Sequence, residues 1–426
     1  MNTIHQHGTD IESNYRWNFT VNVLDFASYS LGLSFASFMT ILPLYVSRLT
    51  TSTMLIGLLP ALANTGWTLP QLFTANAVGR RPRKKPYILA VSIGERLPFL
   101  LLALAILGRP RTSTTASLTV FFVLITIYSF SGGLTGVAWQ DYIAKLIPLR
   151  RRGIFFGVAN SLSGILGTVG AYGSGLILER YPFPRNFAAC FLVAFAAVSL
   201  SWLLFSLGRE PAVPSAEPAI SQREYWQRLP AVLRRDKNFV RYLLSRAVII
   251  LGGMAGGFIT VYAVNRFQVP DRTAGWFTAA LLAGQAVSNP LLGRLADRRG
   301  HKLVMELATV LSALAMALSL GADSVAWFFP VFALIGCASS GWLSSMSITF
   351  EFCSPEDRPT YIGLTNTLLW PAVTLAPMLG GWIAGGLGYR ELFAVALVAS
   401  MAGGALLHWT VRDPRQADAQ GNTAAG

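Results

Sequence analysis

The chain has 426 residues, of which 53% are hydrophobic and only 13% are charged. Soluble globular proteins carry about 25% charged residues, so this composition excludes an ordinary soluble domain and indicates a membrane protein. The formal net charge of +14 does not indicate a nucleic-acid partner, because the basic residues gather in short loops between apolar stretches, as in membrane proteins.

Twelve apolar stretches are long enough to cross the ~30 Å hydrocarbon core, which needs roughly 20 residues. They do not alternate between apolar and polar residues, so we expect helices rather than the strands of a membrane barrel. The predicted spans are 19–46, 53–75, 86–107, 117–144, 154–178, 186–207, 240–264, 273–292, 302–321, 324–350, 360–385 and 390–411. The fold class is therefore an all-α membrane protein.

The loops are more basic on one side of the membrane, above all at Arg80 to Lys85 and Arg150 to Arg152. The positive-inside rule places these loops and both termini in the cytoplasm of a cell's inner (plasma) membrane. We expect the loops to contact anionic lipids of the inner leaflet.

A central loop divides the spans into two sets of six. The predicted domains are a cytoplasmic tail (1–18), a first bundle (19–207), a linker (208–239), a second bundle (240–411) and a cytoplasmic tail (412–426). The linker begins with a Pro- and Ala-rich segment and continues as an amphipathic helix. Residues at equivalent positions match between the halves, as with Gly157 and Gly363 or Gly175 and Gly381, which predicts two pseudo-symmetric six-helix bundles.

Ionisable residues inside a membrane are expensive, and they are the best pointers to function. Asp25 and Glu95 are the candidates for proton exchange. Asp25 shares a helix face with small and polar residues, including Tyr29, but an Asp in a structural ion pair is an equal alternative. Glu95 is followed by Arg96, and because adjacent helix residues point about 100° apart, we expect separate partners and a bracing role.

Arg246 in the seventh span could bind an anionic group of a substrate or neutralise Asp25, but reaching back to the membrane surface is the favoured interpretation. Other polar or aromatic side chains are weaker candidates for a substrate cavity. The complete set of cavity candidates is Tyr29, Ser129, Gln140, Arg246, Gln285, Ser340 and Trp342.

The loop between the eighth and ninth spans contains Gly293, Asp297, Arg298, Gly300 and Lys302. This Gly-x-x-x-Asp-Arg-x-Gly pattern is one of four features by which the chain resembles the major facilitator superfamily. The other three are the span count, the central loop and the repeat. The resemblance implies a cytoplasmic latch in this loop, and Glu306 would brace it.

In that superfamily the same motif also lies between the second and third spans. Here that copy is degenerate, because Asn76 stands in place of the Asp. The resemblance further implies that Asp141 at the end of the fourth span accepts a latch arginine, for which Arg80 and Arg81 are the candidates.

We therefore expect a secondary transporter that moves a small molecule by alternating access, coupled to protons. The alternatives are a sensor or scaffold that does not transport, and a membrane enzyme acting on lipid phosphates. No catalytic residues, metal ligands or cofactor motifs are predicted, nor any nucleic-acid partner, and a monomer is expected. The substrate, the coupling mode and the direction are not encoded in a recognisable motif.

Overall fold

The structure is a computed structural model of the chain. It describes all residues except 1, 80, 109–112, 149–150, 212–231, 354–357 and 414–426. For residues 2–13, 72–73, 75–79 and 358–360 it describes the backbone only. Most of the predicted amphipathic helix of the linker and most of the C-terminal tail lie outside the described residues.

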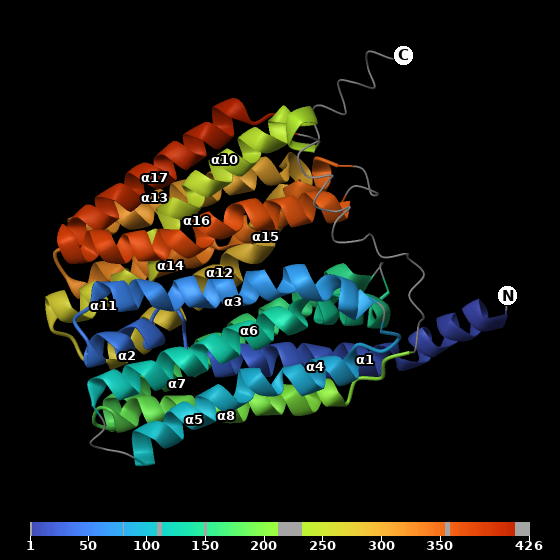
Figure 1. Ribbon diagram of the computed structural model, residues 1–426, viewed down its shortest axis with the longest axis horizontal. Coiled ribbons are helices and arrows are strands. Elements are labelled where there is room, and N and C mark those ends of the chain that lie inside the picture. Colours follow the sequence, from blue (N-terminus) through green and yellow to red (C-terminus); the bar gives the residue numbers. More distant parts are fainter. Residues whose placement is uncertain are drawn as a thin grey trace. The chain divides into compact units, whose positions relative to one another are not determined.

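All regular structure in the described part of the chain is helical (Figure 1). The first helices are α1 (Asn2–Ser34), α2 (Ile41–Leu49), α3 (Thr53–Gly79), α4 (Lys85–Val91), α5 (Ile93–Gly108), α6 (Thr114–Leu146), α7 (Arg152–Arg180) and α8 (Arg185–Ser206). The later helices are α10 (Lys237–Gly252), η2 (Gly253–Ala255), α11 (Gly256–Phe267), α12 (Arg272–Arg299), α13 (His301–Gly321), η3 (Val325–Trp327), α14 (Phe328–Ala338), α15 (Ser340–Glu351), α16 (Arg358–Gly386) and α17 (Tyr389–Thr410).

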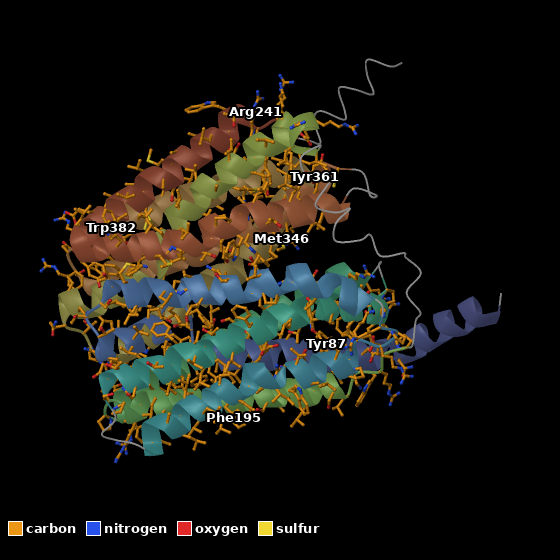
Figure 2. All side chains as sticks on the ribbon, in the orientation of Figure 1. Tyr87, Phe195, Arg241, Met346, Tyr361 and Trp382 are labelled. Atoms are coloured by element: carbon orange, nitrogen blue, oxygen red, sulfur yellow. The ribbon has the colours of Figure 1, made fainter. Side chains whose placement is uncertain are left out.

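Within the described ranges, nine helical stretches are long and apolar enough to cross a membrane. Three other predicted spans correspond to α1 with α2, α3 and α12, which are helical but are not among those nine. Large apolar side chains such as Trp382 and Val398 are exposed, with 62% and 65% of their surface accessible (Trp382 is labelled in Figure 2). Such exposure is expected for side chains that face lipid.

Four predicted spans are interrupted: 19–46, 86–107, 240–264 at η2 and 324–350 at Ser339. The expectation of one helix over 19–46 is wrong, because α1 ends at Ser34 and α2 begins only at Ile41. Pro43 has no N–H to continue the ladder of α1, and it is tolerated in the first turn of α2. The third span is divided at Ser92, where α4 ends, and this break shapes the site described below.

The chain forms two compact units. The first comprises Met1–Thr51, Leu62–Ala219 and Pro270–Ala279, and the second comprises Ser52–Ala61, Ile220–Val269 and Ala280–Gly426. In the first unit α1 packs against α7 and α8, and α5 packs against α6 and α8. In the second unit α10 packs against α16 and α17, and α13 packs against α14, α15 and α17.

The same pair of hydrogen bonds joins α1 to the segment after α8, and α10 to the segment after α17. In the first unit the amide of Asn18 donates to Arg209 O at 3.1 Å, and its oxygen accepts from Arg209 N at 2.8 Å. In the second unit Asn238 makes the same reciprocal pair with the backbone of Arg412, with both distances 2.9 Å. Such equivalent hydrogen bonds are expected if the two halves are repeats of one another.

The matched glycines Gly175 and Gly381 also have equivalent surroundings. A Cβ atom on Gly175 would lie 2.9 Å from the carbonyl oxygen of Arg272, the first residue of α12. A Cβ atom on Gly381 would lie 2.7 Å from the carbonyl oxygen of Thr53, the first residue of α3. Each glycine therefore permits close packing against the start of another helix, as small residues do in membrane proteins.

Candidate functional site

A cluster of polar side chains is buried among α1, α5 and α6 in the first unit. Glu95 on α5 is only 6% exposed. The hydroxyl of Tyr29 donates to Glu95 Oε2 at 3.0 Å, and the hydroxyl of Thr135 donates to Oε1 at 3.0 Å. A second tyrosine hydroxyl, that of Tyr128, lies 2.9 Å from the hydroxyl of Tyr29. Both oxygens of the Glu95 carboxylate are thus hydrogen bonded.

Arg96 supplies the positive charge of this cluster. Its Nη1 lies 3.3 Å from Glu95 Oε2, so the expectation that these adjacent residues cannot pair is wrong. Adjacent residues leave a helix about 100° apart around its axis, but both of these side chains are long enough to turn toward each other. The guanidinium also donates to the carbonyl oxygen of Ser92 at 2.8 Å, at the break between α4 and α5, and to that of Val198 at 3.3 Å.

Asp25 is the second buried carboxyl group, and it is 8% exposed. The hydroxyl of Ser201 on α8 donates to Asp25 Oδ1 at 2.5 Å. Asp25 lies close enough to Glu95 and Arg96 for electrostatic interaction with both. It forms no ion pair with any side chain that the structure describes, so a structural ion pair for Asp25 has no observed partner.

A separate set of charges surrounds the C-terminal end of α6 in the first unit. Asp141 at the end of α6 pairs with Lys84 and Lys145, each with an N···O distance of 3.4 Å. The expected partner Arg81 instead lies over the ring of Tyr87, with its Cζ 4.9 Å from the ring centroid, and Arg80 lies outside the described residues. Burial, and then the neighbouring charge of Lys145, lower the pKa of Lys84, while Asp141 opposes both effects.

Glu210, which the sequence analysis placed in a flexible linker, holds this end together. Its side chain is 2% exposed, and its two oxygens accept from the backbone N–H groups of Lys84 and Lys85, each at 2.8 Å. The ammonium group of Lys85 in turn donates to the carbonyl oxygens of Ser206 and Gly208 at 2.7 and 2.8 Å. A carboxylate thus meets the N-terminus of α4 and a cation meets the end of α8, as helix dipoles favour.

Replacing Glu210 with Gln is expected to lower the free energy of unfolding by about 1.5–3 kcal/mol, because hydrogen bonds to a charged acceptor are worth that much. Thermal unfolding of the detergent-purified protein measures the change. The control is Glu391→Gln, since Glu391 is an exposed acid in α17. Equal unfolding temperatures for the two variants would contradict a structural role for the Glu210 carboxylate.

The predicted latch in the second unit has a defined turn. Gly300 has a φ of 96°, a conformation that favours glycine, and its N–H donates to Ala296 O at 2.9 Å. Lys302 lies 3.5 Å from Glu306 Oε1 and donates to His408 O at 3.0 Å, while His408 Nδ1 lies 3.2 Å from the same Glu306 oxygen. Gly293, Asp297 and Arg298 are exposed on α12, and their role in a gate stays a prediction.

Comparisons with known proteins bear on the whole chain. A profile of the Major Facilitator Superfamily matches residues 242–425. Multidrug resistance protein MdtG from Salmonella typhimurium is 22% identical over 403 residues, which cover 91% of this chain and 93% of MdtG. Sugar efflux transporter A from Dickeya chrysanthemi is 25% identical over 260 residues, which cover 59% and 61% of the two chains. The second half of the chain thus matches the major facilitator superfamily profile, and the relatives that cover more of the chain are named as efflux and resistance proteins.

A third relative, a multi-drug resistance efflux pump PmrA homolog from Lactococcus lactis, is 28% identical over 144 residues, covering 34% of this chain and 33% of the relative. The match therefore spans only about a third of that pump and about three fifths of the Dickeya protein. With these relatives, the superfamily indicates a transporter rather than an enzyme.

Two solved structures show the same fold. A D-xylose-proton symporter has a TM-score of 0.72 at 13% identity, with 94% of this chain and 99% of the symporter covered. The nucleoside transporter NupG (D323A mutant) has a TM-score of 0.68 at 14% identity, with 91% and 97% covered. At such low identity the likeness concerns the superfamily fold and not the substrate.

The predicted cavity residues differ in their surroundings within each unit. Tyr29 belongs to the buried cluster around Glu95. Ser129 and Ser340 are buried and hydrogen bonded within or between helices: Ser129 donates to Ile125 O at 2.9 Å, and Ser340 donates to Asn289 Oδ1 at 2.8 Å. Gln140 and Trp342 are exposed, and Gln285 and Arg246 are half-buried.

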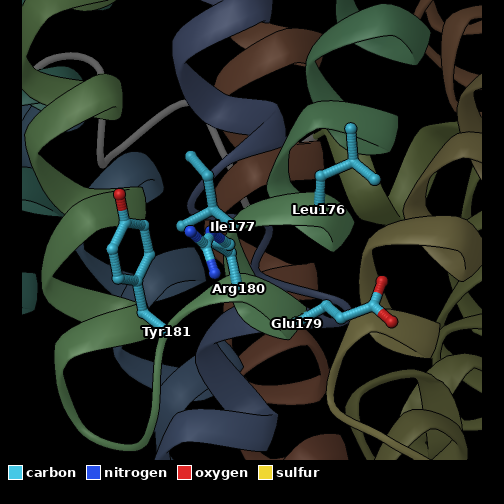
Figure 3. Close-up of a pocket in the computed structure, with 5 residues that line it drawn as sticks. All are labelled: Leu176, Ile177, Glu179, Arg180 and Tyr181. Carbon is cyan, nitrogen blue, oxygen red and sulfur yellow. The ribbon is translucent and has the colours of Figure 1, made fainter.

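A pocket on the first unit lies at the end of α7 (Figure 3). It is lined by Leu176, Ile177, Glu179, Arg180 and Tyr181. The carboxylate of Glu179 forms an ion pair with Arg272, and none of the predicted site residues lines the pocket. Nothing in its lining connects it to the cluster around Glu95.

Proposed function

We propose that this chain is a proton-coupled secondary transporter of the major facilitator superfamily that moves a small organic molecule out of the cell. Twelve membrane helices in two pseudo-symmetric bundles would expose a central site alternately to each side. The protein would act as a monomer in the inner membrane, with both termini in the cytoplasm and basic loops against anionic lipids. The observation that carries the proposal is the buried cluster of Asp25, Glu95 and Arg96.

The charges of this cluster favour proton exchange. The cluster has two carboxyl groups but only one guanidinium. Arg96 pairs with Glu95, and no described cation pairs with Asp25. A buried charge without a partner is costly, so binding one proton would neutralise the cluster and releasing it would restore a charge. Asp25 would carry the coupled proton, while Glu95 would hold the neighbouring helices through Tyr29 and Thr135.

The outward direction is proposed from the relatives. Three of them are named as efflux or resistance proteins, for drugs or for sugars. The cytoplasmic gate would comprise the loop from Gly293 to Lys302 in the second unit. In the first unit it would comprise Arg80, Arg81 and Asp141, with Lys84 and Glu210 added by the observed contacts.

Replacing Asp25 with Asn is expected to abolish coupled proton movement, because the amide cannot bind and release the proton. Ethidium, lactose or benzoate would be added in turn outside proteoliposomes that contain the pH-sensitive dye pyranine. The fluorescence of the dye would report proton movement. We expect at least one probe to move protons with the wild-type protein. The Asn variant should move at least tenfold fewer protons but still exchange labelled probe at equal pH on both sides.

The matched control is Asp323→Asn, which makes the same chemical change on an exposed loop. Undiminished proton movement with Asp25→Asn would overturn the proton role. Binding of a probe without any flux, coupled or uncoupled, would favour a sensor that does not transport.

A further inference from the structure

Three hydrogen-bond donors in the second unit are buried without partners. They are Arg246 Nε on α10, and Thr367 Oγ1 and Trp370 Nε1 on α16, and none has a hydrogen-bond partner among the side chains and backbone that the structure describes. Buried donors in proteins are nearly always satisfied, so three exceptions in one unit require an explanation.

The three donors lie at one level of two packed helices. The helices α10 and α16 contact each other and run in the same direction. Near their starts, Tyr361 donates to Asp236 Oδ2 at 3.0 Å (Tyr361 is labelled in Figure 2), and near their ends a Cβ atom on Gly380 would lie 2.8 Å from Met254 O. These contacts fix the register between the helices.

Arg246 and Trp370 both fall about midway between these two contacts. At 1.5 Å per residue, their positions along the helices agree to within about 3 Å. Thr367 precedes Trp370 by three residues, so both lie on the same face of α16. The structure thus places a guanidinium, an indole N–H and a hydroxyl at one level of α10 and α16, and it describes no acceptor for Arg246 Nε, Trp370 Nε1 or Thr367 Oγ1.

The charge of Arg246 is also unbalanced. Four acids of this unit have partners other than Arg246: Asp236 caps α10 and accepts from Tyr361, Glu306 pairs with Lys302, Asp323 accepts from Trp327, and Glu351 lies 3.8 Å from His301. Arg246 forms no ion pair with any described residue. Arg246 is half-buried, and its Nε is shielded from solvent without an acceptor, whereas an arginine at the membrane surface can hydrate its donors. The position therefore favours a bound anion over that alternative.

We propose that Arg246, Thr367 and Trp370 form the binding site for an anionic group, a carboxylate, on the transported molecule. A guanidinium binds a carboxylate through paired, charge-assisted hydrogen bonds, and the indole and hydroxyl supply two further donors. This inference rests on the proposed transport function and narrows its substrate class to small organic acids.

The test compares acids with neutral molecules of similar size. The full chain in dodecyl maltoside is unfolded thermally with benzoate or benzamide, and with gluconate or glucose. At least one acid is expected to raise the unfolding temperature, as any ligand of the folded state does, and its neutral analogue is not. Arg246→Gln should abolish the shift, and Trp370→Phe and Thr367→Val should each weaken acid affinity about tenfold, the effect of one hydrogen bond to a charged group.

The matched control is Arg266→Gln, since Arg266 is an exposed arginine at the end of α11 in the same unit. Equal shifts by acid and neutral analogue, a shift that persists in Arg246→Gln, or no shift by either acid would overturn the anion site. An Arg246-dependent shift produced by phosphatidylglycerol, but not by the acids, would assign the site to a lipid headgroup and overturn the substrate proposal.

A second measurement needs no ligand. Arg246→Met is expected to raise the unfolding temperature of the ligand-free protein, because it removes a buried Nε–H group for which the structure describes no acceptor. A lower unfolding temperature would show that Arg246 has a structural partner and would overturn the proposal. The two proposals can fail separately. If the acids did not bind but lactose still drove proton movement that depended on Asp25, the anion site would be wrong and the proton role of Asp25 would stand.

Discussion

Replacing Arg96 with methionine is expected to lower the free energy of unfolding by about 3–5 kcal/mol, the usual cost of removing one partner from a buried ion pair. Methionine approximates the volume of the arginine stem but leaves the Glu95 carboxylate without its cation. The carbonyl oxygens of Ser92 and Val198 would also lose a donor. Thermal or chemical unfolding in detergent measures the effect.

The matched variant is the double replacement Glu95→Gln with Arg96→Met, which removes both charges. We expect it to recover most of the lost stability, because a neutral amide can still accept from Tyr29 and Thr135. A double variant no more stable than Arg96→Met alone would show that the ion pair is not the source of the loss.

Replacing Gly133 with alanine is expected to cost about 3 kcal/mol, the upper end of the range for overpacking. A Cβ atom there would lie 2.1 Å from Gly66 O and 2.8 Å from Trp67 O, which are backbone atoms of α3. Backbone cannot rotate away as a side chain can, so α3 and α6 would have to separate. The unfolding temperature in detergent and the yield of folded protein report the effect.

The control for Gly133 is Gly157→Ala on α7, where an added Cβ meets nothing within 4 Å. There alanine should be neutral or stabilise the helix by up to about 1 kcal/mol, because it is the better helix former. If the two variants unfolded at the same temperature, the close approach of α3 and α6 at Gly133 would not matter for stability.

The helical spans were predictable because each one needs an apolar run of nearly fixed length, and that signal is local. The interruptions at residues 35–40 and at Ser92 were not predicted. Each occupies only a few residues, and it depends on contacts made after the helices pack. Gly300 was predictable as part of a motif, and its positive φ gives a physical reason for glycine there.

The candidate site was predictable only in its charges. Asp25, Glu95 and Arg96 stand out because charges are rare inside a membrane. Their hydroxyl partners Thr135 and Ser201 do not stand out, since hydroxyl residues are common in membrane helices. Glu210 was missed because the Pro- and Ala-rich sequence after it suggested a flexible linker. One signal could have indicated it: Glu210 is the first acid after a span whose neighbouring loops are strongly basic.

The reciprocal asparagine pairs have a consequence for how the protein could be divided. One pair joins Asn18 of α1 to Arg209 after α8, and the other joins Asn238 of α10 to Arg412 after α17. A cut in the segment between Arg209 and Asn238 would break neither pair. If two genes each encoded one half, each polypeptide should therefore still form the hydrogen bonds between its first helix and the segment after its last helix. A half closed by such hydrogen bonds is what a gene duplication would have had to copy.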